Sequence, residues 1–173
     1  MPSPVGHALA GIAAGWLVDR PGALARTVVF GLAGTAADVD LLFGAHSGPT
    51  HGLGAAVIAG MLVAAVSSVR LRAEATRSAK EGAIRFAGAV MAAYASHTLL
   101  DWLGTDLSPP IGIMALWPFS SDYYESHLHL FSAISRRYWL PEFVTWNARA
   151  LAGELAILLP VIALVFFARR RPA

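Results

Sequence analysis

The sequence has no cysteine and few charged residues, and both shortages exclude classes of protein. Without cysteine there is no disulfide and no thiolate ligand, so a metal site must use histidine, aspartate or glutamate. Charged residues make up 14% of the 173 residues, whereas a soluble domain carries about a quarter. The polar surface is too small to cover a water-soluble globule. A formal net charge of only +2 gives no reason to expect a nucleic-acid partner.

Apolar residues are abundant instead, at 56% of the chain with a mean hydropathy of +0.57. They fall into five segments, 5–18, 27–43, 52–69, 83–103 and 151–168. A membrane-spanning helix needs about 20 residues, with about 17 as the lower limit, so the first segment is marginal. We predict an all-α integral membrane protein, a bundle of about five apolar helices forming a single domain over 1–173. Small residues recur at close spacing, which lets helix backbones approach and permits a homo-oligomer without requiring one; they are Gly11, Gly15, Gly31, Gly34, Gly82 and Ala89.

The distribution of Lys and Arg predicts the orientation. No basic residue precedes the first apolar segment, so we expect no cleaved signal peptide there. If the segments alternate, ten of the thirteen basic residues lie on one side: Arg20, Arg26, Arg70, Arg72, Arg77, Lys80, Arg85, Arg169, Arg170 and Arg171. Only Arg136, Arg137 and Arg149 lie on the other. The positive-inside rule then puts the N-terminus outside and the C-terminus in the cytoplasm of a bacterial-type inner membrane.

One apolar segment carries a histidine and an aspartate four residues apart, His97 and Asp101. This spacing puts both side chains on one face of a helix, where together they can bind a divalent cation such as Zn²⁺. The alternative is a buried, hydrogen-bonded polar pair. The predicted topology brings further polar residues to the same outer side, namely His7, Asp38, Asp40, His46 and His51. Ionisable groups in apolar segments mark functional sites by default, so this convergence favours a metal centre.

Asp38 and Asp40 pose a geometric question, because residues two apart on a helix point nearly opposite ways. Both can serve one site only if the helix ends there. One would then be a metal ligand and the other would orient a ligating imidazole. In isolation, each polar residue also has a simpler interpretation, such as a solvated helix end for the aspartates or a helix cap for His51.

Residues 104–149 form an outer excursion rich in proline and aromatic residues. Prolines at 109, 110, 118 and 141 interrupt regular structure, and the aromatic residues suit a bilayer interface. We predict one or two helices lying on the membrane surface as an outer interfacial cap over the site.

Five short motifs occur in an order that resembles the YdjM-like family: Gly6-His7-Ala8, Ala37-Asp38-Val39-Asp40, Thr50-His51-Gly52, His97 to Asp101, and Leu116-Trp117-Pro118-Phe119. The resemblance covers nearly the whole chain. Members are inner-membrane-associated proteins regarded as metal-dependent hydrolases and as distantly similar to zinc-dependent phospholipases C. In that fold a His-x3-Asp helix supplies ligands to a cluster of zinc ions.

The resemblance implies a ligand set. One metal would be held by His51, His97, Asp101 and either Asp38 or Asp40, and Asp101 would bridge to a second metal held by His7. The family loop resembles His-Arg-Gly-x-Thr-His, but here Ser47 replaces the arginine, which removes any phosphate contact that the arginine made. A later His-x3-Glu for a third metal is absent. For Glu125, His127 and His129 we favour an exposed loop cluster over a substitute third site.

These residues predict a membrane-bound metal-dependent hydrolase, phosphoesterase or phospholipase-like, that cleaves a lipid or lipid-linked substrate at the outer face of the membrane. Two divalent cations, Zn²⁺ or Mn²⁺, would activate water, and the aspartate that is not a ligand (Asp38 or Asp40) would take the proton. Arg136, Arg137 or Arg149 would grip the phosphate, unless these arginines only snorkel to the interface.

The competing interpretations are a non-catalytic membrane metal-binding or metal-transport protein, a peptidase without the His-Glu-x-x-His motif, and a structural module.

Overall fold

The computed structural model describes residues 1–44, 46–71 and 75–170. In these ranges the regular structure is helical, as predicted, apart from two isolated β-bridges, Gly104–Phe131 and Ile113–Tyr124. In chain order the elements are α1 (Pro4–Asp19), α2 (Leu24–Thr35), η1 (Ala36–Phe43), η2 (Pro49–His51), α3 (Leu53–Arg70), α4 (Arg77–Leu103) and α5 (Phe143–Arg169). Helices α1, α2 and α3 start within three residues of the predicted segment starts, whereas α4 and α5 start six and eight residues earlier than predicted.

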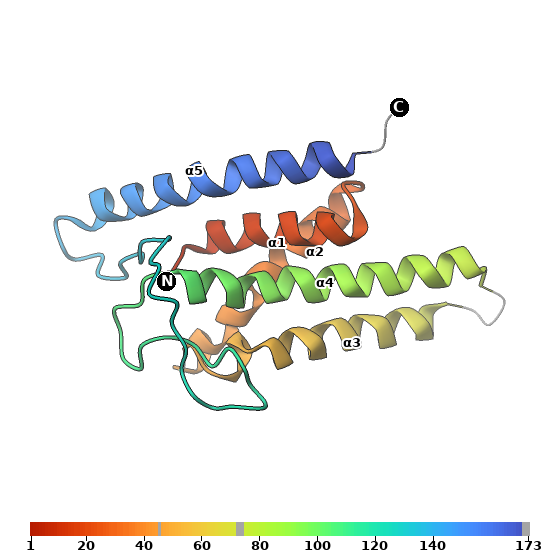
Figure 1. Ribbon diagram of the computed structural model, residues 1–173, viewed down its shortest axis with the longest axis horizontal. Coiled ribbons are helices and arrows are strands. Elements are labelled where there is room, and N and C mark those ends of the chain that lie inside the picture. The colour runs from red at the N-terminus through yellow and green to blue at the C-terminus, as the bar shows by residue number, and fades with distance from the viewer. Residues whose placement is uncertain (45, 72–74, 171–173) are drawn as a thin grey trace.

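Helix α1 lies at the centre of the bundle and packs against α2, α4 and α5, while α3 packs against α4 (Figure 1). Figure 1 also shows where the helix ends gather. The start of α1, the end of α4, the starts of α3 and α5 and the loop between α4 and α5 all lie at one end of the bundle. Residues far apart in the sequence are therefore brought to a common end.

Glycines let α1 and α2 touch backbone to backbone. A Cβ atom on Gly11 would lie 2.5 Å from the carbonyl oxygen of Phe30 and 2.8 Å from the Cα of Gly34. Gly15 similarly makes room for the Phe30 ring, which is fully buried. The predicted close approach is thus confirmed for Gly11, Gly15 and Gly34. It does not extend to Gly82, where a Cβ would meet nothing within 4 Å.

The second apolar segment changes its winding before it ends. The α-helix stops at Thr35 and continues as the tighter 3₁₀ helix η1, which Gly44 terminates with a left-handed φ of 71°. A 3₁₀ helix has about three residues per turn, so the angle between side chains two apart differs from that of an α-helix. This change of winding governs where Asp38 and Asp40 point.

Two helices are long and apolar enough to cross a membrane, α3 and α5. Only 11% of the apolar window of α3 and 22% of that of α5 are buried, so their apolar side chains face outward. A core helix of a soluble protein would be mostly buried, and exposed apolar area on this scale favours contact with lipid. The predicted bundle of five helices is present, but among the described residues two of the five, α3 and α5, are long and apolar enough to span a membrane.

The predicted surface helices between α4 and α5 are wrong. Residues 104–142 form an irregular loop without helix, and α5 begins at Phe143, so the last part of the predicted cap belongs to α5. Proline lacks a backbone N–H and disfavours the helical conformation of the residue before it. Pro109, Pro110 and Pro118 prevent a long helix only in the first part of the loop. Residues 119–140 contain no proline, and their backbone bonds to α4 instead, as in the hydrogen bonds of Ser126 to Trp102 and of Leu130 to Leu103.

The basic residues follow the predicted partition along the bundle. Arg20, Arg26, Arg70, Arg77, Lys80, Arg85, Arg169 and Arg170 belong to the helix ends and turns opposite the 104–142 loop (Figure 1). Arg136, Arg137 and Arg149 lie in that loop and in the second turn of α5. Arg72 and Arg171 fall outside the described residues. The orientation of the bundle in a membrane stays a prediction.

Candidate metal centre

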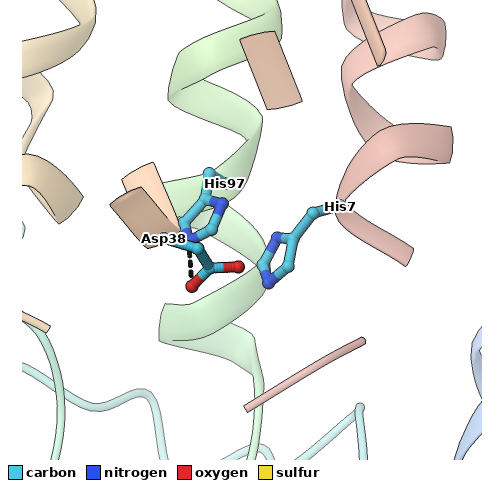
Figure 2. A group of neighbouring side chains, drawn as sticks. All are labelled: His7, Asp38 and His97. Atoms are coloured by element: carbon cyan, nitrogen blue, oxygen red, sulfur yellow. Dashed lines mark ion pairs between the residues drawn. The ribbon is translucent and has the colours of Figure 1, made fainter. Parts of the chain in front are cut away.

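The predicted ligands meet at one end of the bundle. His7 comes from the first turn of α1, Asp38 and Asp40 from η1, His51 from η2, and His97 and Asp101 from the last turns of α4. Figure 2 shows His7 and His97 approaching the Asp38 carboxylate from two different helices. With His46, described below, these residues are called the central cluster.

His51, His97 and Asp101 present ligand atoms within 4.8 Å of one another, and Asp38 approaches the two imidazole nitrogens of this group. Asp101 Oδ2 lies 3.1 Å from His97 Nε2 and 3.5 Å from His51 Nε2. Asp38 Oδ1 lies 3.8 Å and 3.7 Å from the same two nitrogens. Around a tetrahedral Zn²⁺ with bonds of about 2.0–2.1 Å, ligand atoms lie roughly 3.3 Å apart. The donor set of two imidazoles and two carboxylates therefore fits a divalent metal ion.

The same atoms also lack hydrogen-bond partners. Among the described residues, no hydrogen bond reaches His51 Nε2, His97 Nε2 or either carboxylate oxygen of Asp101, although all three side chains are buried. A buried polar atom without a partner costs roughly 1–3 kcal/mol. This makes the alternative of a self-satisfied buried polar network a poor description of the site, and it favours a bound cation.

Hydrogen bonds fix the imidazoles that face this position. His97 Nδ1 lies 2.8 Å from the carbonyl oxygen of Gly34, which can only accept, so Nδ1 carries the proton and Nε2 is free to bind a metal. His51 Nδ1 lies 3.3 Å from Asp40 Oδ2, which also accepts a hydrogen bond of 2.9 Å from the Thr50 hydroxyl. Both contacts orient a ligating imidazole from behind.

The two aspartates of η1 therefore face different partners. Asp38 Oδ1 points to the Nε2 atoms of His51 and His97, as a ligand would, whereas Asp40 Oδ2 contacts the far nitrogen of His51. The two aspartates thus differ in the way that a metal ligand and an orienting residue would, which were the two roles that the sequence left unassigned between them.

His7 forms the other side of the central cluster. Its Nε2 lies 3.3 Å from Asp101 Oδ1, and its ring stacks on that of His97 with the centroids 3.8 Å apart. His7, Asp38 and His97 together also form a group that could hold an ion (Figure 2). Asp101 thus presents one oxygen to His7 and the other to His51 and His97. That arrangement is the one a bridging carboxylate would need.

His46 belongs to the central cluster, although it was not among the predicted ligands. Its Nδ1 lies 3.6 Å from Asp40 Oδ1 and 4.0 Å from Asp38 Oδ1, and it forms a further group with Asp38 and His51. Burial lowers the pKa of His46, and the nearby His51 and Arg136 lower it further, which favours the neutral imidazole that binds metals. Its position five residues before His51 in the same loop was the available signal.

The loop between α4 and α5 holds the start of α3, and so His51, in place. The amides of Leu53 and Gly54 donate hydrogen bonds of 2.9 Å each to the carbonyl oxygens of Ala115 and Trp117. Helix α4 adds two contacts, since Tyr94 and Thr98 donate to the carbonyl oxygens of the Thr50-His51 pair at 2.9 and 2.7 Å. The Leu116 to Phe119 motif thus serves the site by capping α3.

Glu154 of α5 fixes the first turn of α1 and was not predicted to have a role. Its carboxylate is buried, accepts a hydrogen bond of 2.6 Å from the amide of Ser3, and is also bonded to the Ser3 hydroxyl. Ser3 caps α1 by accepting from the amide of Gly6 at 3.1 Å, and the Ser3 carbonyl accepts from the amide of His7 at 3.0 Å. The pair therefore links α5 to the turn that carries His7.

A cavity of about 620 Å³ lies against the central cluster. Asp38 and His46 line it on one side, and Arg136 and Arg137 on another. Arg136 Nη2 lies 3.4 Å from His46 Nε2, so the guanidinium is next to the metal-binding groups. Apolar side chains form much of the remaining wall: Leu41, Leu107, Ile134, Leu140, Phe143 and Trp146. The third arginine, Arg149, is not among the lining residues.

Glu125, His127 and His129 come together in the loop, apart from the central cluster, as a fourth group that could hold an ion. His127 and His129 are exposed, as predicted.

The family model described as "YdjM inner membrane protein" matches residues 1–172, and the chain belongs to that family. No curated protein and no solved structure matches the chain.

Proposed function

We propose that this member of the YdjM inner membrane protein family is a membrane-bound, metal-dependent hydrolase that cleaves a phosphoester of a lipid or lipid-linked substrate at the outer face of the membrane. The observation that carries the proposal is the cavity, in which a buried His/Asp cluster adjoins two arginines and an apolar wall. A hydrolase for an amphiphilic phosphoester needs these three surfaces together.

The central cluster would hold two ions, Zn²⁺ or Mn²⁺. His51, His97, Asp101 and Asp38 would hold the first, and His7 would hold the second, with Asp101 as the bridge. Bound ions of this kind lower the pKa of water and neutralise charge on a phosphoryl oxygen. Asp40, the aspartate that is not a ligand in this scheme, would take the proton; in its support, the buried Oδ1 atom of Asp40 accepts no hydrogen bond among the described residues.

Arg136 and Arg137 would hold the phosphate. A guanidinium binds phosphate oxygens with two parallel hydrogen bonds, and Arg136 lies beside His46 at the edge of the central cluster. A phosphate that contacts Arg136 would therefore lie next to the metal-binding groups.

The apolar half of the substrate would follow the cavity wall toward the exposed aromatic side chains around it. Tyr138 and Trp139 are 77% and 67% exposed, and α5 continues this surface with outward apolar residues. Tyr and Trp favour the membrane–water boundary. With the N-terminus outside and the C-terminus in the cytoplasm, the cavity would face the periplasm or the cell exterior.

The second candidate, a metal transporter, lacks a feature it needs. In the described residues, the polar residues that are buried as a whole lie in the half of the bundle that contains the central cluster: Ser3, His7, Asp40, Ser47, His51, Ser96, His97, Thr98, Asp101 and Glu154. At the opposite end the side chain of Asp19 is also buried, but it is paired with Arg26 at 2.6 Å. A transport path would continue with polar groups toward the other end. A metal-binding protein without catalysis needs no such path and remains the alternative that the experiment tests.

The test begins with metal analysis of the detergent-purified protein beside Asp101→Ala and His97→Ala. The central cluster should contribute two equivalents of transition metal, as expected for a bridged pair, and both variants should lose most of this contribution relative to the wild type. Protein without metal, and unable to take up Zn²⁺ or Mn²⁺ at micromolar concentration, would overturn the proposal.

Turnover is then measured on phosphodiester and phosphomonoester lipids in mixed micelles. Arg136→Ala should raise KM or lower kcat by at least tenfold, since it removes a charge-assisted contact of about 1.5–3 kcal/mol, while metal content stays unchanged. Arg149→Ala is the matched control, because Arg149 does not line the cavity. A fully metal-loaded protein that hydrolyses none of these lipids would support the non-catalytic alternative.

A further inference from the structure

Glu125, His127 and His129 lie on the loop between α4 and α5 and share no residue with the central cluster. Their ligand atoms lie within 4.8 Å of one another. His127 Nδ1 is 3.5 Å from Glu125 Oε2, and His129 Nδ1 is 3.6 Å from Glu125 Oε1. Each imidazole thus faces one oxygen of the same carboxylate.

The Glu125 carboxylate is unusual for a loop residue. Its side chain is only 13% exposed, against 83% for that of His127. Within the part of the chain that the structure describes, the Glu125 carboxylate accepts no hydrogen bond of standard geometry. Its ion-pair partners there are the imidazoles of His127 and His129. A mostly buried carboxylate is costly unless it is paired or coordinates a metal.

The backbone holds this arrangement at both ends. The amide of Ser126 donates to the carbonyl oxygen of Trp102 at 3.0 Å, and that of Leu130 donates to the carbonyl oxygen of Leu103 at 2.8 Å. The short segment is therefore seated on the last turn of α4, where helix carbonyls lack intrahelical partners.

Between these anchors, both histidines adopt left-handed backbone conformations, with φ of 55° at His127 and 48° at His129. This conformation is uncommon for residues with a Cβ atom and costs on the order of 1 kcal/mol or more each. The loop thus holds two histidines in a strained conformation beside one carboxylate.

We propose that Glu125, His127 and His129 form a second, peripheral cation site on the surface of this loop, independent of the central cluster and of hydrolase activity. Two imidazoles and a carboxylate select borderline divalent cations, Zn²⁺, Cu²⁺ or Ni²⁺, over Mg²⁺ and Ca²⁺. Three protein ligands leave a position for water or for a donor from another molecule. This assignment revises our sequence-based interpretation of these residues as a loop cluster without metal.

The test is Zn²⁺ binding by equilibrium dialysis of the detergent-purified full chain. The His127→Ala/His129→Ala double variant should lose one equivalent relative to wild type and keep the remainder. Leu128→Ala is the matched control, because it changes the exposed residue between the two histidines and should bind as the wild type does. Leu128→Ala should unfold at the wild-type temperature, whereas the double variant should stay folded but unfold somewhat below it, because Glu125 loses its two imidazole partners.

Asp101→Asn separates this proposal from the proposed function. The Asp101→Asn variant should still bind one Zn²⁺ equivalent. This equivalent should be lost when His127 and His129 are replaced as well. Retention of the equivalent after both histidines are replaced would overturn the peripheral site, whatever the fate of the central one. A change in Mg²⁺ or Ca²⁺ binding equal to that of Zn²⁺ would overturn the assigned selectivity.

Discussion

Asp38→Asn and Asp40→Asn should affect metal binding to very different extents. Asp40 contacts the far side of the His51 ring at 3.3 Å, so its replacement removes the charge that orients the imidazole and leaves the donor atoms in place. Loss of such a partner typically weakens metal affinity by about 10–100-fold, or roughly 1.4–2.7 kcal/mol. Asp38 faces the Nε2 atoms of both His51 and His97, and its replacement turns one of the four proposed donors from an anionic into a neutral oxygen. The metal affinity of the Asp38→Asn variant should therefore fall by more than about 100-fold.

Competition with a chromophoric chelator measures both affinities in the same detergent. Asp122→Asn is the surface control, because Asp122 lies in an exposed turn and bonds only to Ser120. Equal losses for Asp38→Asn and Asp40→Asn would refute the division into a ligand and an orienting residue. Wild-type affinity in Asp38→Asn would refute its role as a ligand.

Three further predictions concern how the fold holds the site. Gly34→Ala should lower the free energy of unfolding by about 1–3 kcal/mol or more in a thermal-unfolding assay, because a Cβ at this position would collide with α1. Gly82→Ala, the control, should be neutral or stabilising by up to ~1 kcal/mol. Equal effects of the two substitutions would contradict the backbone contact between α1 and α2. Glu154→Gln should reduce the melting temperature and metal content together, since it breaks the link to the turn carrying His7, and unchanged values in both would show that the link is dispensable. Tyr94→Phe should cost about 1 kcal/mol by removing the bond to the Thr50 carbonyl oxygen, and an unchanged melting temperature would contradict that bond's contribution.

The elements of the site that local spacing determines could be predicted from the sequence. His97 and Asp101 share a helix face because four residues make about one turn, and the Asp101–His97 contact of 3.1 Å follows from that alone. The gathering of His7 with them followed from alternating helices, since a bundle of this topology brings odd helix starts and even helix ends together.

The rest depended on geometry that no short pattern contains. The different directions of Asp38 and Asp40 go with the change to a 3₁₀ helix at Ala36, which no periodicity in the sequence predicted. His46 joins the central cluster through the conformation of a loop. Glu154 was assigned no role because its partner Ser3 lies 151 residues away in the sequence.

The proline-rich loop was interpreted as helical because its aromatic residues resembled an interfacial helix. Its true ordering comes from long-range contacts, such as the amide of Thr105 donating to the carbonyl oxygen of Phe131 at 2.8 Å and that of Leu53 donating to Ala115 at 2.9 Å. The periodicity of apolar residues in the sequence gives no information about such contacts.

The central cluster and the wall of the cavity come from different parts of the chain. Every residue of the central cluster precedes Gly104, whereas most of the cavity wall, including Arg136 and Arg137, follows it. Substitutions in the wall residues between Ala133 and Trp146 can therefore change the size, charge and hydrophobicity of the cavity without touching the segment around Ala115 and Trp117 that holds the start of α3. On the proposed function, the substrate preference of such a chain can change through these wall residues while the metal-binding residues stay the same.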